Sequence, residues 1–463
     1  MKQPDKSDVE PRLFFTEPWD PIVTRRGDPL GLRALSDEFA DVVAPGLSNR
    51  IRDGRWVTIL AWSLLRSHQV FRAMGEQSVD SREQQRQRYA WLQPLELMWV
   101  ARTLKSGVDL RGRSLAGQRA VKRWLDHRGH GTRFGMSAEQ SRAYRQTGMY
   151  GGFRLGFRRW PGLTRAGDGW TPDDATFRLA RWLDKNMGST RPEWSCDAES
   201  ETPRRVSLSK GSEDKWWIKH WPEFFKMVRG ADVRTLPRPR DEFCRLPEAS
   251  LLKPVLFFES DKDGSRRLKV ALKSGKCTGG THLDLCKHLS SEFSDDPVFH
   301  ALPHFSRLAD AGVEAMAFIA AMISNGPTMG LTSIANNPAA PRVCKELYAA
   351  ARVWEKTKRP PLRHIDTADR LSEAIRSPKP TECLTALLHH HETHGGGLRW
   401  FVLRGKPCAV EPRTPPRRVS SRYRFRLWPL CRLAVQCGVL TKMPSALLSS
   451  REMDEDTQED SDE

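Results

Sequence analysis

The sequence predicts a mainly α-helical chain of several domains, with a small β-hairpin region near its C-terminal end that makes the class α+β. Apolar residues recur at helical spacing along most of the chain, and Gly and Pro interrupt these stretches. The length of 463 residues exceeds what a single hydrophobic core usually holds. The period-two pattern typical of strands is found late in the chain, after residue 397.

The N-terminal part predicts four helices. Pro45 and Gly46 end the first of them, because proline cannot continue a helix. The second is apolar nearly all round, which is typical of a buried helix, and the third is amphipathic. The expected helices cover residues 29–43, 56–74, 93–104 and 114–129.

The C-terminal part mixes helices and strands. Residues 246–358 are expected to be mostly helical, with breaks at "SNGPTMG" and "NNPAAP", and a further helix is expected over 366–376. The stretch "LRWFVLRGKPCAV" predicts a hairpin with strands 398–403 and 407–410. A short helix is then expected from Pro429, ending before a glycine that suits the position after a helix end.

Shifts in composition divide the chain into regions. A stretch rich in Ser, Pro, Glu and Arg predicts a linker, and an acidic C-terminal end predicts a disordered tail. The expected regions are an irregular N-terminal arm (1–28), a helical N-terminal domain (29–110), a winged-helix-like domain (111–187), a linker (188–213), a helical domain (214–358), a mixed α/β C-terminal region (359–440) and the acidic tail (441–463).

The formal net charge of +18 hides an asymmetry, because the last 13 residues carry eight acidic groups and one basic group. Arginine supplies 54 of the 75 basic residues. A basic body predicts a polyanionic partner, since each neutralised phosphate releases counterions. A GC-rich genome would enrich arginine as well, without any such partner. The acidic tail is expected either to keep the chain soluble or to compete with nucleic acid for the basic surface.

The stretch "YRQTGMYGGFRLGFRRWPGLTRAGDGW" (residues 144–170) carries the strongest functional signal. A helix over 148–160 would place Met149 and three aromatic residues on one apolar face and arginines on the other. The residues after it predict a tight hairpin with Gly-Asp-Gly at the bend. A helix with Thr171 as its N-cap is expected to follow. The arginines that we expect to face a nucleic acid are Arg154, Arg158 and Arg159, helped by Arg142, Arg145 and Arg165.

The order of helix, short turn, basic helix, hairpin and further helix resembles that of winged-helix domains, over about 50 residues. This resemblance implies a basic helix in the major groove and a wing on the phosphate backbone. Two alternatives without nucleic-acid binding stay open at this point. The arginines could be a solvated helix face, or a winged-helix fold could serve protein contacts alone.

Two smaller basic patches are further candidates for nucleic-acid contact. "SNRIRDGR" precedes the apolar helix of residues 56–74, and "SSRYRFRLW" alternates basic and aromatic side chains as a strand would. A solvated loop and a core strand are the alternative interpretations. The candidate residues are Arg50, Arg52 and Arg55 in the first patch and Arg422, Arg424 and Arg426 in the second.

The sequence offers no catalytic signature, and no cofactor or metal is expected. "HHHETH" has the spacing HExH, which differs from the zinc motif HExxH. The carboxylates of "FFESDKDGSRRLK" (Glu259, Asp261 and Asp263) predict a turn in preference to a nuclease site. Nine scattered cysteines without a CxxC pair indicate reduced thiols. The weak metal candidates are His390, His394, Cys277, His282 and Cys286.

Three blocks of the sequence together resemble a family of uncharacterised bacterial proteins associated with mobile and phage-defence gene islands. The blocks are "APGLSNRIRDGRWVTILAWSLL", "YRQTGMYGGFR" with "DGWTP", and "GGGLRWF" with "SSRYRFRLWPLCRLAVQCGV". The resemblance implies a cytoplasmic subunit of a multi-protein defence or DNA-transaction system. It carries no catalytic assignment.

Three classes of function follow from these patterns. The leading hypothesis is a nucleic-acid-binding subunit, with DNA favoured over RNA, other proteins of the same system as partners and no membrane contact. It would bind through arginine–phosphate contacts and one basic helix. The first alternative is a nuclease with a diffuse metal-dependent site, and the second is a protein–protein scaffold. No apolar run is long enough to span a bilayer, and the first residues lack the apolar core of a signal peptide.

Overall fold

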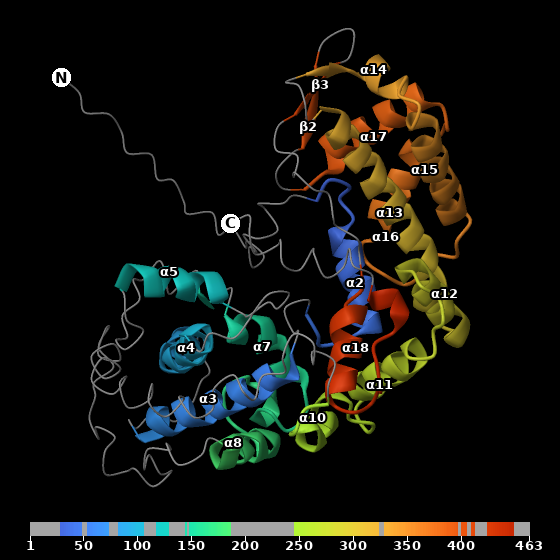
Figure 1. The fold of residues 1–463 in the computed structure, drawn as a ribbon. Coiled ribbons are helices and arrows are strands. Elements are labelled where there is room, and N and C mark those ends of the chain that lie inside the picture. Colours follow the sequence, from blue (N-terminus) through green and yellow to red (C-terminus); the bar gives the residue numbers. More distant parts are fainter. Residues whose placement is uncertain are drawn as a thin grey trace, which may run out of the picture. The chain divides into compact units, whose positions relative to one another are not determined.

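The chain is mainly helical in a computed structural model (Figure 1). The model describes residues 28–48, 53–73, 82–105, 117–128, 144–145, 148–186, 245–323, 328–396, 400–404, 409–412 and 424–448. The predicted linker of residues 188–213 lies outside the described residues. Among the helices that are described, none is long and apolar enough to cross a membrane.

The chain forms two compact units that interleave along the sequence. Unit 1 contains residues 1–34, 307–357 and 364–422. Unit 2 contains residues 35–306, 358–363 and 423–463. The expected regions followed one another along the chain, whereas the compact units take segments that are far apart in sequence. Composition reports local changes along the chain, but a compact unit depends on which segments pack together.

The first part of unit 2 is a group of helices around a core rich in aromatic residues. The apolar helix predicted over 56–74 is α3, and its Trp62 packs edge-on against Trp99 with ring centroids 5.8 Å apart. Pro94 lies inside α4, which begins well before the predicted residue 93. These helices are α3 (Gly54–Ala73), α4 (Arg82–Lys105), α5 (Gln118–Arg128), α7 (Met149–Arg159) and α8 (Asp174–Asn186), with the 3-10 helix η1 (Arg165–Gly167). Helix α2 (Arg33–Val43) precedes them in the chain.

The remaining helices of unit 2 come from two distant parts of the sequence. Phe425 precedes α18 and packs between Phe39 and Phe305, at centroid distances of 5.7 and 5.9 Å. This aromatic cluster joins the C-terminal segment to α2 and to the start of α13. The elements are α10 (Ala249–Leu256), α11 (Lys262–Ser274), α12 (His282–Glu292), α18 (Leu427–Gln436) and η5 (Ser445–Leu447), with the first residues of α13 (Pro297–Ile323).

Unit 1 combines helices with a small antiparallel sheet in the order β1-β3-β2. Strands β2 and β3 form the hairpin predicted from "LRWFVLRGKPCAV", in a register that pairs Leu403 with Val410. The breaks predicted at "SNGPTMG" and "NNPAAP" separate α13, α14 and α15. The elements are the rest of α13, β1 (Met329–Gly330), α14 (Leu331–Ala335), α15 (Ala340–Glu355), α16 (Ile365–Ala374), α17 (Pro380–His394), β2 (Phe401–Arg404) and β3 (Ala409–Pro412).

The predicted boundary of the acidic tail at residue 441 is wrong for its first eight residues. Residues 441–448 are described and include η5, and Met443, Ala446 and Leu447 are buried. The Ser445 hydroxyl also donates a hydrogen bond to the Gly279 carbonyl, at 3.0 Å. These apolar residues keep the segment packed, and the acidic stretch itself lies outside the described residues.

The end of α18 is the glycine-terminated helix end that the sequence predicts. Gly438 has a φ of +70°, a conformation that costs about 1–2 kcal/mol for residues with a Cβ. Its N–H donates to the Val435 carbonyl, and the Val439 N–H donates to the Ala434 carbonyl. The glycine therefore lets the chain reverse while the last carbonyls of α18 stay hydrogen-bonded.

We expect Gly438→Ala to lower the free energy of unfolding of unit 2 by about 1 kcal/mol, because alanine must adopt this left-handed conformation. The measurement is urea denaturation. Gly280→Ala is the matched control, since a Cβ there meets no atom within 4 Å and its φ is not positive. Equal stability of the two variants would contradict the assignment.

Candidate nucleic-acid interface

Helix α7 has one fully buried face, as its sequence predicts. Met149, Phe153, Phe157 and Trp160 are all buried. Gly156 is part of this face because a Cβ there would lie 2.6 Å from the Trp160 ring. The indole therefore folds back against its own helix, which only glycine permits. This packing compensates for the low intrinsic helix propensity of the glycines in the segment.

The opposite face of α7 carries exposed side chains, among them Arg154, Leu155, Arg158 and Arg159. The helix contains no acidic residue, and Arg158 and Arg159 lie in its last turn. Cations in the last turn interact favourably with the negative end of the helix dipole. The buried face fixes the orientation of α7, so its arginines can only point outward.

Three arginines lie around Tyr150 at the N-terminal half of α7. Burial raises the pKa of the Tyr150 hydroxyl, while the positive charges of Arg154, Arg158 and Arg145 oppose that increase. Partial burial lowers the pKa of Arg154, and the nearby Arg158 and Arg145 lower it further. Arg145 also lies over the Tyr89 ring, 5.3 Å from its centroid. The fold therefore holds like charges together, which favours a bound anion.

The loop after α7 is tied to the helix by hydrogen bonds. The Thr164 hydroxyl donates to the Phe157 carbonyl at 2.6 Å and accepts from the Gly169 N–H at 3.1 Å. The predicted hairpin is reduced to a single bridge between Thr164 and Pro172, and η1 lies between them with Arg165 exposed. We define the arginine face as the described side chains of Arg145, Arg154, Arg158, Arg159 and Arg165.

The helix after this loop begins later than its sequence predicts. Thr171 was expected as N-cap, but α8 starts at Asp174. The Thr171 carbonyl accepts a hydrogen bond from the Arg165 N–H at 2.9 Å, and Pro172 belongs to the bridge with Thr164. The pairing across the loop thus takes up the two residues that the helix was expected to use.

A buried carboxyl group holds the start of α7. Glu96 on α4 is fully buried, and its Oε1 accepts a hydrogen bond from the Tyr150 N–H at 2.6 Å. Burial raises the pKa of Glu96 to about 8, although the hydrogen bond from the Tyr150 N–H opposes the shift. Gly148 leaves room for this arrangement, because a Cβ there would lie 2.8 Å from Glu96 Oε2. Glu96 was not among the residues predicted from the sequence, because it stands between two buried leucines of α4.

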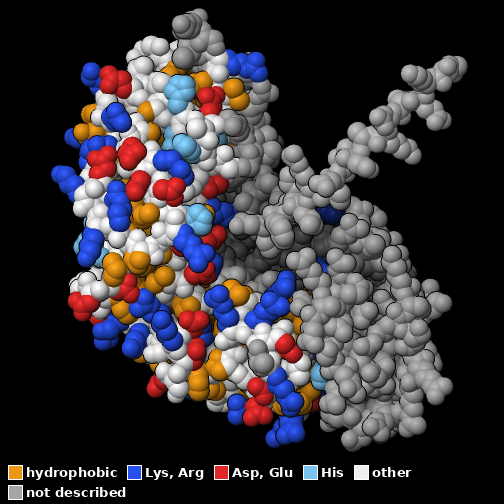
Figure 2. All heavy atoms as spheres, turned by 180° about the vertical axis from the view of Figure 1, so that it is seen from behind, with side chains coloured by type: hydrophobic (Ala, Val, Ile, Leu, Met, Phe, Trp, Pro, Cys, Tyr) orange, Lys and Arg blue, Asp and Glu red, His pale blue; other side chains and the backbone are white. Residues whose placement is uncertain are grey.

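The arginine face comes from a stretch of the sequence without acidic residues. Residues 141–167 contain six arginines and no Asp or Glu. In the described part of the chain, no carboxylate forms an ion pair with Arg154, Arg158, Arg159 or Arg165. By contrast, Figure 2 shows basic and acidic side chains interspersed over the described surface in that view.

Arg55 does not belong to a surface patch, which corrects the prediction for "SNRIRDGR". Its side chain is 1% exposed, and it pairs with the fully buried Glu248. Arg55 Nη2 donates to Glu248 Oε2 at 2.8 Å, and the guanidinium lies over the Trp182 ring, 5.2 Å from its centroid. A buried, paired arginine is not accessible to a polyanion. Arg50 and Arg52 lie outside the described residues.

The predicted strand "RYRFRLW" is also corrected. Phe425 and Arg426 have φ values of +51° and +57°, which no strand residue adopts, and α18 begins at Leu427. Arg426 forms ion pairs with Asp41 and Asp37 of α2, so it serves the fold. Arg424 is half-buried, and Arg142 and Arg422 lie outside the described residues.

Four of the five histidine and cysteine candidates form two pairs. His282 and Cys286 are buried on α12, with Nδ1 and Sγ 3.8 Å apart, and His282 stacks on Phe425. His390 and His394 face one another at the end of α17, with ring centroids 4.9 Å apart. Cys277 is buried near the end of α11. Within the described ranges, no group of three or more His, Cys, Asp or Glu side chains could hold a metal ion.

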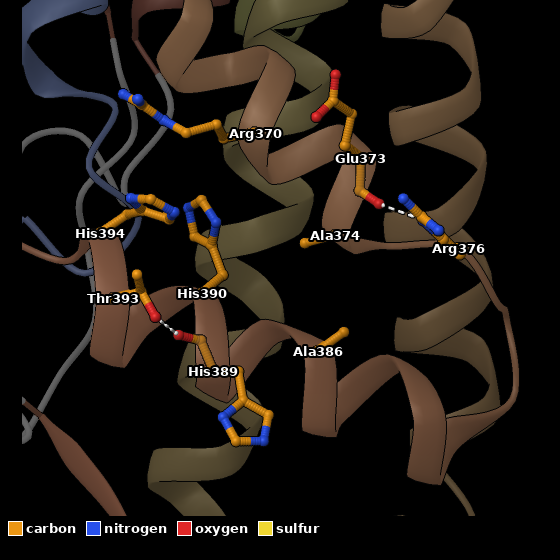
Figure 3. A pocket seen from close by; sticks show the side chains of 9 residues that line it. All are labelled: Arg370, Glu373, Ala374, Arg376, Ala386, His389, His390, Thr393 and His394. Carbon is orange, nitrogen blue, oxygen red and sulfur yellow. Dashed lines mark hydrogen bonds between the residues drawn. The ribbon is translucent and has the colours of Figure 1, made fainter.

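A shallow groove between α16 and α17 contains His390 and His394 (Figure 3). Nε2 of His390 is 3.0 Å from the Leu30 carbonyl, and burial lowers the pKa of His390 to about 4. His391 is buried, with Nδ1 2.9 Å from the Pro29 carbonyl and Nε2 accepting from the Trp400 N–H at 3.0 Å. These two histidines of "HHHETH" thus hold the segments that pack on α17.

The carboxylates considered for a nuclease are placed at a helix start. Asp261 is the N-cap of α11, and its side chain accepts a hydrogen bond from the Gly264 N–H at 2.8 Å. This agrees with a turn at Glu259–Asp261, while Asp263 lies in the first turn of α11.

Comparison with known proteins adds no assignment. The sequence matches no protein-family model, and no curated protein or solved structure shows a match to it.

Proposed function

We propose that this chain binds nucleic acid, with duplex DNA as its ligand, and that α7 with the loop after it forms the interface. The observation that carries the proposal is the arginine face: five arginines on one helix and its flanks, without carboxylate partners among the described residues. Guanidinium groups fit phosphate oxygens in a planar, bidentate geometry, and arginine keeps its charge in contact with a duplex.

The order of elements supports a winged-helix assignment for this segment. Helix α7 would be the recognition helix, the loop closed by Thr164 and Pro172 would be a short wing, and α8 would pack behind them. Arg165 in the loop would then contact the backbone beside the groove that α7 occupies. We also propose that the chain works in the bacterial cytoplasm as a subunit of a defence or DNA-transaction system, together with other proteins of that system.

The test is duplex binding at two salt concentrations, measured by fluorescence anisotropy. Five arginine–phosphate contacts predict a slope of log K against log salt of about −4.5. The affinity should then fall about 500-fold between 50 and 200 mM salt. For Arg154→Ala/Arg158→Ala/Arg159→Ala, two contacts remain, so the slope should be about −1.8 and the loss about 12-fold.

A control variant that loses the same number of positive charges at another site distinguishes a local interface from general attraction between the basic protein and DNA. Lys262→Ala/Lys269→Ala/Lys276→Ala removes three exposed positive charges on and after α11. It should leave the slope unchanged. If both triple variants weaken binding equally, the interface is not the arginine face. If the unmodified protein binds no duplex at either salt concentration, the proposed function is wrong and the scaffold hypothesis gains support.

A further inference from the structure

The outward face of α7 has an apolar centre between two positively charged sides. Residues advance by about 100° around a helix axis, so Gly151 and Leu155 define a line along its surface. Arg158 and Arg154 lie about 40° and 80° to one side of this line, and Arg159 lies about 60° to the other side. The exposure of these residues agrees, with Gly151 half-exposed and the other four exposed.

Leu155 is 37% exposed, one of four large hydrophobic side chains exposed in the described part of the chain. A single exposed leucine is ordinary on a protein surface. Its position is informative because charged side chains flank it on both sides. When the phosphates of a duplex contact these arginines, another part of the DNA must lie opposite Leu155 at the centre of the face.

If α7 lies in the major groove, the part of the DNA opposite Leu155 is the edge of a base pair. Helices that enter this groove contact phosphates with side chains at their flanks and base edges with side chains at their centre. The apolar group that the common bases display there is the C5-methyl group of thymine. 5-Methylcytosine places a methyl group on the same ring position. Gly151, one turn before Leu155, adds no side chain that would hold the helix away from the groove.

We propose that Leu155 is a specificity-determining residue that contacts C5-methyl groups of pyrimidines in the major groove of duplex DNA. The inference rests on the proposed function, because it requires α7 to face a duplex. Its chemistry is apolar contact, so it adds a preference for methyl-bearing pyrimidines to the sequence-independent attraction of the arginines. Leu155 itself makes no phosphate contact.

The experiment compares a mixed-sequence duplex of about 30 base pairs with the same duplex in which deoxyuridine replaces every thymidine. Uracil keeps the base pairing and the O4 acceptor of thymine and lacks only the methyl group. The unmodified protein should bind the uracil duplex about fourfold more weakly for each contacted methyl, the factor that burial of one such group supplies. Leu155→Ala should bind both duplexes equally. Leu272→Ala, which changes a 42% exposed leucine on α11, should discriminate as the unmodified protein does.

A second substitution adds methyl groups to the other pyrimidine, cytosine. Replacing cytidine by 5-methylcytidine in the uracil duplex should restore affinity for the unmodified protein and not for Leu155→Ala. Salt-steep binding without any discrimination by the unmodified protein would overturn this inference and leave the proposed function standing. Discrimination that survives Leu155→Ala would overturn it as well. If the unmodified protein binds no duplex at all, both this inference and the proposed function are wrong.

Discussion

Replacing Glu248 with alanine is expected to lower the free energy of unfolding of unit 2 by about 3–5 kcal/mol, because it leaves the Arg55 charge buried without a partner. Both side chains are almost completely buried. Glu248 accepts two hydrogen bonds from the guanidinium, and its Oε1 accepts a third from the Thr58 hydroxyl at 3.3 Å. Water cannot reach Arg55 to compensate for the lost carboxylate. The measurement is urea denaturation followed by circular dichroism.

Two controls make this result specific. Arg55→Met/Glu248→Leu removes both charges together and should destabilise less than Glu248→Ala alone, since no uncompensated charge remains. Glu346→Ala removes a carboxylate whose partner Arg342 is 63% exposed, and such surface pairs contribute about 0–1 kcal/mol. If Glu248→Ala lost no more stability than Glu346→Ala, Arg55 would not be paired in the interior.

Glu96→Gln is expected to change how stability depends on pH. The pKa of Glu96 in the fold is about 8, above its ordinary value of 4.5, because burial disfavours the charged carboxylate. The fold therefore binds this proton more tightly than the unfolded chain does. The contribution of Glu96 to stability is complete below about pH 4.5 and is lost as the pH rises through about 8.

Glutamine has no proton to lose and can keep the hydrogen bond from the Tyr150 N–H. The stability of the variant relative to the unmodified protein should therefore rise between pH 5 and pH 9, on the order of 4 kcal/mol in total. Urea denaturation of both proteins across this range gives the difference between their free energies of unfolding at each pH. The contributions of all other titrating groups are the same in both proteins and cancel in this difference. Parallel curves would show that Glu96 is not a buried acid. The largest gain is expected at high pH, where the native carboxylate is charged beside the start of α7.

The sequence predicted the helices well where a local pattern settled the local structure. The buried face of α7, the apolar helix α3 and the glycine end of α18 follow from spacing and from the conformational freedom of glycine. The hairpin of β2 and β3 follows from two short apolar runs around Arg404-Gly405. In each case, residues close together in sequence carry the whole signal, so no distant contact was needed to interpret it.

Local sequence patterns could not distinguish buried from exposed arginines near apolar helices. Arg55 and Arg158 both border apolar stretches, yet the first is buried and the second is exposed. The difference comes from Glu248, which the fold brings to Arg55 from 193 positions along the chain. The alternation of "RYRFRLW" misled for a similar reason. Phe425 packs in an aromatic cluster with α2 and α13, and Arg426 pairs with Asp41, so the backbone turns where a strand was expected.

The sequence by itself determined the helical class, the excess of positive charge and the apolar and basic faces of α7. These properties depend on periodicity and composition, which a chain carries before it folds. Only the tertiary structure decided which arginines face solvent, which residues surround Tyr150, and that Glu96 lies buried at the start of α7. Burial and charge pairing depend on segments that meet only in the folded chain. Their free energies therefore depend on partner residues that a local sequence pattern does not identify.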